Sequence, residues 1–230
     1  LAEAGQHVML VDFDPQGNAS SGLGVETGDY EHTVYDMMAE EAELDECLVK
    51  NIQDNLDVLP SDMNLAGAEI EFQEVENKET LLKRYLDKVR DDYDFILIDC
   101  PPSLNILTIN ALTAADTVLV PIQCEYYALE GLNQVLKTVE LVKRKLNPQL
   151  ELEGVVFTMY DARTNLSLQV VESVKNNLNQ TIYKTIIPRN VRLAEAPSHG
   201  MSINLYDTRS TGAESYRMLA AEVMSRGEEL

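Results

Sequence analysis

Short runs of apolar residues alternate along the chain with stretches in which apolar residues recur every three or four positions. A short run that is apolar along its whole length is typical of a strand buried on both faces, whereas the three-and-four spacing is typical of a helix with one buried face. The predicted strands lie at residues 7–12, 56–60, 94–99, 117–122, 152–159 and 183–188.

Helical spacing is found between these strands. The clearest example consists of Leu129, Leu132, Leu136, Val139 and Val142. Pro148 prevents this helix from continuing, and residues 80–89 and 166–178 have the same pattern. Strands that alternate with helices predict an α/β fold with a mainly parallel sheet and helices on both faces. No linker interrupts the pattern, so we expect one domain over residues 1–230.

The first residues indicate where this pattern is incomplete. Leu1-Ala-Glu-Ala followed by Gly5 is typical of the last turn of a helix that a glycine closes. An average helix has about 11 to 12 residues. We therefore expect that most of this helix, and the segment before it, stand ahead of Leu1.

Composition excludes several classes of protein. The chain is 45% hydrophobic and 25% charged, which is ordinary globular usage. No apolar run approaches the roughly 18 residues of a membrane span, and no secretion signal begins the chain. Cys47, Cys100 and Cys124 have no C-x-x-C spacing, so neither a disulfide framework nor a zinc site is predicted. We expect a cytosolic protein.

The net charge of −21 argues against a polyanionic partner, because nucleic-acid affinity depends first on phosphate neutralisation by Lys and Arg. The charge is unevenly distributed, however. Residues 26–94 hold 21 acids and 6 bases, whereas residues 137–217 hold 11 bases and 8 acids. The second half of the chain can therefore carry a local basic patch.

Two carboxylates end the first predicted strand. Asp12 and Asp14 stand one residue apart, so an extended chain places both on the same side. Carboxylates in such a loop can face a common cation or position a water molecule. The alternative is a polar turn that caps the next helix through Asn18 or Ser20.

A third carboxylate, Asp99, follows four apolar residues and precedes Cys100-Pro-Pro. This is the pattern of a Walker B strand, whose Asp holds Mg²⁺, directly or through water, beside the phosphates of a nucleotide. The alternative is an Asp that caps a helix.

Two loops later in the chain combine apolar and cationic residues. Met159 and Pro188 suit the flat faces of an adenine base, and Asn190 can read the edge of the base. Arg163 and Arg192, together with Arg189 in the second of these loops, make a dense cationic group. The alternative is that these arginines are solvated surface residues.

Six blocks of sequence resemble the ParA/Soj chromosome- and plasmid-partitioning ATPases of the deviant Walker group, over the whole chain. The blocks are VDFDPQGNASSGLG from Val11, NLAGAEIE from Asn64, IDCPPSLNILTINAL from Ile98, PIQCEYYALEGL from Pro121, TMYDARTN from Thr158 and IPRNVRLAEAPSHG from Ile187.

The resemblance implies a P-loop NTPase-like fold and a cytosolic, nucleoid-associated ATPase that uses ATP and Mg²⁺. It implies an ATP-dependent homodimer that binds double-stranded DNA without sequence preference and is stimulated by a ParB-like partner, with no membrane attachment.

The resemblance also assigns roles to single residues. It places Asp14 at the water-activating acid and Asp12 at a catalytic acid near Mg²⁺. It places Asp99 at the Walker B acid, which holds the metal. Met159, Pro188 and Asn190 fall in the adenine-side loops, and Arg163 and Arg192 match DNA-binding positions.

One family motif is absent. The phosphate loop K-G-G-V-G-K-T does not occur in the 230 residues. This loop binds phosphates through backbone N–H groups, a lysine and a metal-binding hydroxyl. We expect it, with the first strand, ahead of Leu1, and we expect residues 1–230 by themselves not to hydrolyse ATP.

A rival hypothesis is a non-catalytic interaction protein that has lost the phosphate loop on the same scaffold. The codons ahead of Leu1 distinguish the two hypotheses. A membrane-bound switch similar to MinD requires a basic amphipathic C-terminus. Here Glu222, Glu228 and Glu229 oppose Arg226 alone. An electron-transfer role similar to iron proteins lacks suitably placed cysteines.

Overall fold

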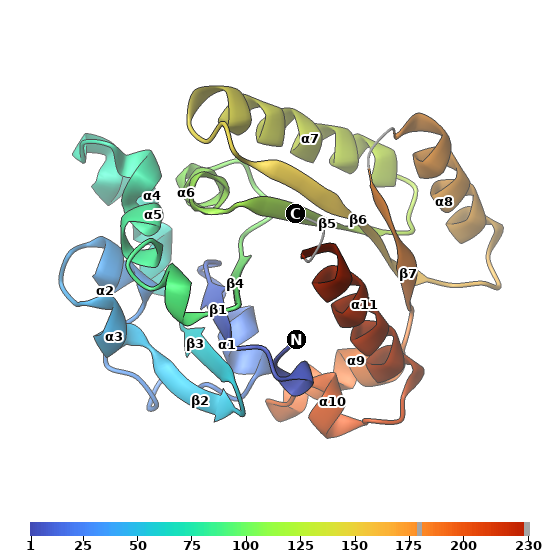
Figure 1. Cartoon of the computed structure of the whole chain (residues 1–230), viewed down its shortest axis with the longest axis horizontal. Helices are drawn as coiled ribbons and strands as arrows, with labels where there is room; N and C mark the ends of the chain where they lie inside the picture. Colours follow the sequence, from blue (N-terminus) through green and yellow to red (C-terminus); the bar gives the residue numbers. More distant parts are fainter. Residues whose placement is uncertain (179–180, 228–230) are drawn as a thin grey trace. The chain divides into compact units, whose positions relative to one another are not determined.

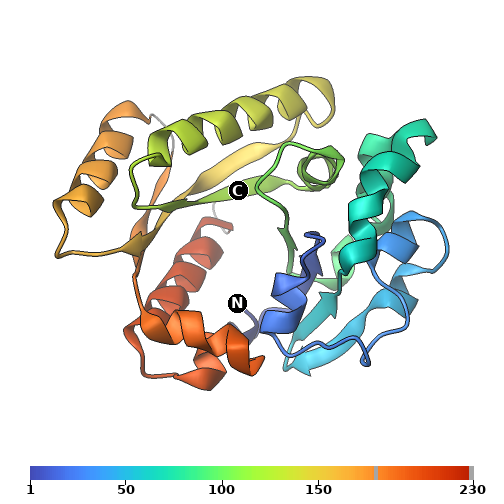
Figure 2. The ribbon, with the colours of Figure 1, turned by 180° about the vertical axis from the view of Figure 1, so that it is seen from behind.

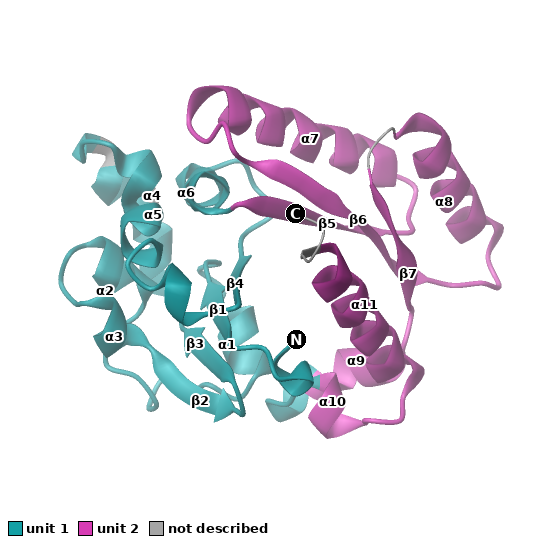
Figure 3. Ribbon diagram, viewed as in Figure 1, with its two compact units in different colours: residues 1–115, 197–202 teal, residues 116–196, 203–230 magenta. Residues whose placement is uncertain are grey.

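The computed structural model describes residues 1–178 and 181–227, so Glu228 and Glu229 of the acidic tail lie outside the described residues. The chain forms two compact units (Figure 3). Unit 1 comprises residues 1–115 and 197–202, and unit 2 comprises residues 116–196 and 203–230. The expectation of one domain over residues 1–230 stays a prediction.

Unit 1 contains a four-stranded sheet with the order β2-β3-β1-β4 (Figure 1). Its strands are β1 (Val8–Asp12), β2 (Val49–Gln53), β3 (Leu56–Leu59) and β4 (Phe95–Asp99). β1 runs parallel to β3 and β4, whereas β2 is antiparallel to β3. Parallel neighbours on both sides bury β1, where Met9 and Val11 are completely enclosed.

The helices of unit 1 are short. They are α1 (Asn18–Gly22), α2 (Val34–Met38), α3 (Leu44–Cys47), α4 (Ala68–Glu71), α5 (Leu81–Leu86) and α6 (Ile106–Ala114). Single 3₁₀ turns lie at η1 (Ala2–Ala4), η2 (Met63–Gly67), η3 (Phe72–Glu74), η4 (Lys78–Thr80) and η5 (Arg90–Asp92). Gly5 closes η1 with a φ of 87°, which fits the predicted glycine-terminated turn.

Unit 2 contains a parallel sheet with the order β5-β6-β7. Its strands are β5 (Thr117–Gln123), β6 (Glu151–Tyr160) and β7 (Ile182–Pro188). Its helices are α7 (Ala128–Lys145), α8 (Asn165–Asn177), α9 (Val191–Glu195), α10 (Ile203–Tyr206) and α11 (Thr211–Gly227). A further 3₁₀ turn, η6 (Ala196–His199), follows α9.

Helices cover both faces of the sheet in unit 2 (Figures 1 and 2). Val155 and Phe157 of β6 pack in a core with residues of α7 and α8. The residue between them, Val156, points to the opposite face and packs with Leu219 of α11. This alternation is the period of two that an extended strand imposes.

The structure confirms the α/β fold class, and all six predicted strands are present within a residue or two of their expected ends. The prediction of a helix over residues 80–89 is wrong in extent, because α5 ends at Leu86 and a turn in which Val89 N donates to Leu86 O follows it. In the part of the chain that the structure describes, no helix is long and apolar enough to cross a membrane.

Candidate functional site

Asp12 and Asp99 end two neighbouring strands of unit 1. They are register partners in the parallel pair β1 and β4, and Phe13 N donates to Asp99 O over 2.7 Å. Parallel strands deliver their carboxyl ends to one edge of a sheet, where open α/β sheets bind ligands. The structure thus brings the carboxylate that ends the first predicted strand and the predicted Walker B carboxylate together.

Asp12 is completely buried and held by Ser20. Its Oδ2 accepts hydrogen bonds from Ser20 N at 2.8 Å and from Ser20 Oγ at 2.7 Å. Its Oδ1 lies 3.4 Å from Asp14 N. A buried carboxylate requires such donors, so Asp12 fixes the loop that follows β1 onto the start of α1.

Asp14 is only partly buried at the turn of this loop. Its Oδ1 accepts from Gln16 N at 3.0 Å, and Gly17 then takes a φ of 62°. A Cβ at Gly17 would lie 2.9 Å from Ser61 O, so only glycine fits this turn against the loop that follows β3. The turn leaves the Oδ2 of Asp14 without a hydrogen bond among the described residues.

Asp99 remains exposed at the sheet edge, but its pKa is raised above the ordinary value. The first cause is partial removal from water, and the second is repulsion by Asp12 and Asp14. The same surroundings raise the pKa of the neighbouring Cys100 thiol to about 11, chiefly through burial. Cys100 is therefore a neutral thiol at physiological pH. The three carboxylates gather negative charge at this edge of the sheet, and a bound cation would offset it.

These carboxylates suit Mg²⁺ bound together with a phosphate. Among the described residues, no group of three or more His, Cys, Asp or Glu is arranged to hold a metal ion alone. Mg²⁺ generally takes only one or two carboxylates and completes its shell with water and substrate phosphates. The exposed Asp99 fits this role, while both hydrogen bonds from Ser20 occupy Oδ2 of Asp12. The role of Asp12 near the metal stays a prediction.

In unit 2, the ends of β6 and β7 bring Met159 and Pro188 into adjoining loops. Tyr160 pairs with Pro188, and Arg189 N donates to Tyr160 O over 2.9 Å. Met159 has a φ of 53°, which is uncommon for a residue with a side chain, and the side chain is exposed. Strained residues of this kind cluster at ligand sites, where the surrounding structure stabilises them.

Asn190 is held on both sides of its amide. Its Oδ1 accepts from Arg192 N at 2.8 Å and so caps α9, while its Nδ2 donates to Thr211 Oγ1 over 2.8 Å. An amide has two donor hydrogens and two acceptor lone pairs. One donor and one acceptor therefore stay available in a fixed orientation.

Both predicted DNA-binding arginines are paired with acids. Arg163, whose side chain is 87% exposed, makes a bidentate pair with Asp161 over 2.9 and 2.7 Å. This pairing and the Arg163 N–H lower the pKa of Asp161 well below its ordinary value. Arg192 lies 2.8 Å from Glu195 and 3.5 Å from Asp207. A phosphate would have to compete with these carboxylates.

Two residues that hold the site are not among the predicted ones. The sequence indicates Ser20 only as an alternative helix cap, although it stands within the block that begins at Val11, eight residues after the Asp12 that it binds. Thr211 binds Asn190 from 21 residues away, and no local pattern marks it. The contact follows from the packing of α11 along β7.

Comparisons with known proteins give the family. Residues 1–152 match the family model described as "AAA domain". The chain is 57% identical to the sporulation initiation inhibitor protein Soj of Bacillus subtilis over 99% of this chain and 90% of that protein. It is 50% identical to the chromosome-partitioning ATPase Soj of Treponema pallidum, over 98% of this chain and 88% of that protein.

A solved structure matches as well. Cobyrinic acid a,c-diamide synthase from Mycobacterium smegmatis, crystallised with ADP and magnesium, has a TM-score of 0.85 at 35% identity. The match covers 98% of this chain and 84% of that one. The identity to the two Soj proteins, over nearly the full length of the chain, confirms the predicted resemblance, and the chain belongs to the Soj/ParA family of chromosome-partitioning ATPases.

Proposed function

We propose that the protein is a Mg²⁺-dependent ATPase that drives the partitioning of chromosomes or plasmids. The observation that carries this proposal is the contrast among three acids at one sheet edge. Asp12 is buried and accepts two hydrogen bonds from Ser20, and Asp99 is exposed with a raised pKa. Asp14 lies on the turn between β1 and α1. Such a contrast divides structural, metal-binding and water-activating roles among similar side chains.

Each acid then has its own task. Asp14 orients the attacking water and accepts its proton through the oxygen that Gln16 N leaves open. Asp99 contributes a ligand to the metal, and Asp12 holds the loop so that Asp14 keeps its place. Bound Mg²⁺ and ATP supply the neutralised phosphate chain on which the water acts.

The loops of unit 2 bind the adenine base in this proposal. Met159 and Pro188 provide apolar surface for the ring, and Asn190 offers one donor and one acceptor to the edge of the base. Structures of cobyrinic acid a,c-diamide synthase from Mycobacterium smegmatis hold ADP or an ATP analogue with magnesium, which supports the same ligands here.

The proposal includes interactions with a second copy of the chain, with DNA and with a partner protein. The ATP-bound protein forms a homodimer, binds double-stranded DNA of any sequence through Arg163 and Arg192, and hydrolyses ATP faster with a ParB-like partner. It acts in the cytoplasm on the nucleoid. The names of the relatives support partitioning, and the excess of bases over residues 137–217 supports the DNA contact.

The test uses the protein as its gene encodes it. Asp14→Ala should bind ATP with Mg²⁺ as the wild type does, while turnover falls about 100-fold or more, since the water loses its base. Equilibrium binding and phosphate release measure the two steps. Asp54→Ala, at an exposed turn between β2 and β3, is the matched control and should leave both steps unchanged.

Normal turnover in Asp14→Ala would overturn the assignment of Asp14. No saturable ATP binding by the wild-type protein would overturn the ATPase proposal and favour a non-catalytic interaction protein, for which the lack of a phosphate loop in these residues is the supporting observation.

A further inference from the structure

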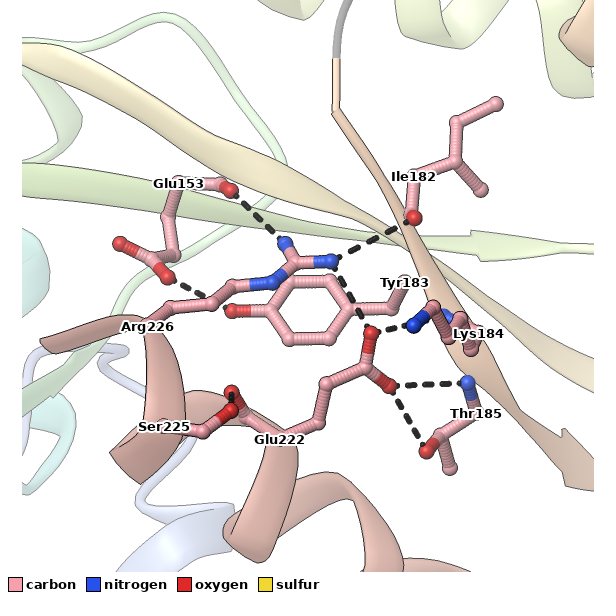
Figure 4. Close-up of polar contacts among 8 residues, drawn as sticks. All are labelled: Glu153, Ile182, Tyr183, Lys184, Thr185, Glu222, Ser225 and Arg226. Carbon is pink, nitrogen blue, oxygen red and sulfur yellow. Dashed lines mark hydrogen bonds and ion pairs between the residues drawn. The ribbon is translucent and has the colours of Figure 1, made fainter. Parts of the chain in front are cut away.

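Helix α11 is fastened to β7 at two places that lie far apart along the helix. At its first residue, Thr211 accepts a hydrogen bond from Asn190, in the loop that follows β7. Three turns later, Glu222 and Arg226 bind the beginning of β7 (Figure 4). Since Asn190 lies beyond the carboxyl end of β7, the helix and the strand run in opposite directions.

The second fastening lies where the strands are irregular. The pairing of β6 and β7 shifts between Val155 and Phe157, where two residues of β6 oppose four of β7. Lys184 N and Thr185 N donate to the two carboxylate oxygens of Glu222 over 2.8 and 3.0 Å, and Thr185 Oγ1 adds a third bond of 2.9 Å. Glu222 thus provides acceptors for two successive N–H groups of β7 at this bulge.

Arg226 completes the same cluster. Its guanidinium lies over the ring of Tyr183 at 3.8 Å and donates to Glu153 O, Ile182 O and Glu222 Oε1 over 3.3, 3.4 and 3.0 Å. The side chains of Glu222 and Arg226 are only 15% and 21% exposed. A charge pair so far removed from water costs free energy unless its geometry is well satisfied, as it is here.

The stretch of helix and the stretch of strand between the two fastenings have similar lengths. Eleven residues of helix separate Thr211 from Glu222, or about 16 Å at 1.5 Å per residue. Six residues of extended chain separate Lys184 from Asn190, or about 20 Å at 3.3 Å per residue. A rigid helix bound at both ends of this segment fixes how far Asn190 lies from the bulge.

We propose that α11 determines the adenine selectivity of the nucleotide site by fixing Asn190, with Thr211 and Glu222 as positioning residues. The inference rests on the proposed function. The fixed amide presents a donor and an acceptor in one order, and this order suits adenine, which offers a donor and an acceptor side by side. Guanine has an acceptor in place of the donor at the corresponding position, so a loosened Asn190 discriminates less between the two bases.

Glu222→Gln and Thr211→Val test the two fastenings separately in the protein as its gene encodes it. Gln places an NH₂ group against one of the two strand N–H donors, and Val removes the hydroxyl from an exposed position without changing the shape of the side chain. Calorimetry with Mg²⁺-ADP and Mg²⁺-GDP measures the ratio of the two dissociation constants. Each variant should reduce the preference for ADP over GDP about fivefold, which is the factor that corresponds to about 1 kcal/mol for one lost hydrogen bond.

Asp87→Asn is the matched control. It removes a carboxylate from another i,i+4 pair, which Lys83 of α5 forms with Asp87 just after the helix, and should leave the ratio unchanged. Thr211→Ser keeps the hydroxyl and should restore the wild-type ratio.

The outcomes separate the two proposals. A wild-type protein that does not prefer ADP to GDP overturns the adenine site of the proposed function. A wild-type preference that is unchanged in both variants overturns the role of α11, as does an equal loss of affinity for both nucleotides. If Glu222→Gln does not fold, Thr211→Val decides, because its position is exposed.

Discussion

Asp12 and Asp14 show how strongly one residue of separation changes the environment of a carboxylate. Asp12 is enclosed and held by two hydrogen bonds from Ser20, so it behaves as part of the backbone framework. Among the residues that the structure describes, the carboxylate of Asp14 accepts a hydrogen bond only from Gln16 N. β1 ends at Asp12, so Asp14 belongs to the turn and not to the strand, and burial decides which of the two carboxylates remains available for chemistry.

Asp99 gives a prediction on pH dependence. Its pKa in the folded protein is raised, so the folded state binds protons more readily than the unfolded chain, and stability decreases as the pH rises above about 4. Asp99→Asn removes this cost. The variant should unfold at a higher temperature than the wild type at pH 7 in EDTA, and the difference should shrink at pH 4.

The expected gain is small, below about 1 kcal/mol, because Asp99 is exposed and water screens the repulsion. Thermal melts at both pH values measure it, with Asp54→Asn as a control in which no gain is expected. A variant that is less stable than the wild type at pH 7 would show that the carboxylates do not repel one another as described.

At the scale of elements, β6 is tightly packed at Gly154, just before its bulge with β7. Gly154 has a φ of 156°, and a Cβ there would lie 2.8 Å from the ring of Tyr183 and 3.1 Å from Arg226 Nη1. A side chain would need both an unfavourable backbone and a shift of the Tyr183 ring and of the Arg226 guanidinium that lies over it. The glycine, the aromatic ring and the guanidinium therefore form one packing unit.

Two glycine substitutions, one in this packing unit and one outside it, should change the free energy of unfolding in opposite directions. Gly154→Ala should lower the free energy of unfolding by about 1–3 kcal/mol, through backbone strain and contact with Tyr183. Gly131→Ala, on α7 where a Cβ meets nothing within 4 Å, should raise it by about 0.5–1 kcal/mol through helix propensity. Urea denaturation measures both. A Gly154→Ala protein as stable as the wild type would contradict the close packing at this bulge.

Sequence patterns anticipate elements whose burial is continuous and miss those whose formation depends on distant contacts. The apolar runs at β1 and β4 are recognisable, and strand direction then brings Asp12 beside Asp99. The edge strand β2 is mostly polar and none of its residues is buried, so its sequence carries no such run. Thr211 and Glu222 act through contacts 21 and 37 or more residues away, and these contacts depend on a register shift that no local pattern reveals.

At the scale of the whole molecule, the proposed binding to DNA has to overcome a net charge of −21. Over distances greater than a Debye length of about 8 Å, physiological salt screens the repulsion from the acidic residues 26–94. Nearer to the duplex, the carboxylates that pair with the arginines matter most. Asp161 therefore limits the attraction that Arg163 offers to a phosphate.

Substitutions of the pair should change DNA affinity in opposite directions. Arg163→Ala and Arg192→Ala should each weaken ATP-dependent binding to an arbitrary duplex and reduce the slope of log affinity against log salt by about 1. Asp161→Asn should strengthen binding, because Arg163 loses its competing partner. Fluorescence anisotropy at several salt concentrations measures the slopes.

Arg84→Ala is the control, since Arg84 pairs with Glu40 in the acidic stretch, and it should leave the slope unchanged. Dimerisation is measured beside DNA binding in each variant. If removal of the arginines abolishes dimerisation, or leaves DNA binding unchanged while dimers form, the arginines do not contact DNA.

Residues 197–202 return to unit 1, and this limits how the chain can be divided into separate pieces. Gly24 and Gly200 approach so closely that a Cβ on either would lie 2.8 Å from the backbone of the other, so the returning segment is an integral part of unit 1. The chain therefore passes between the units three times, after residues 115, 196 and 202. No single cut yields two intact pieces, and genetic recombination can exchange neither unit as one uninterrupted stretch of coding sequence.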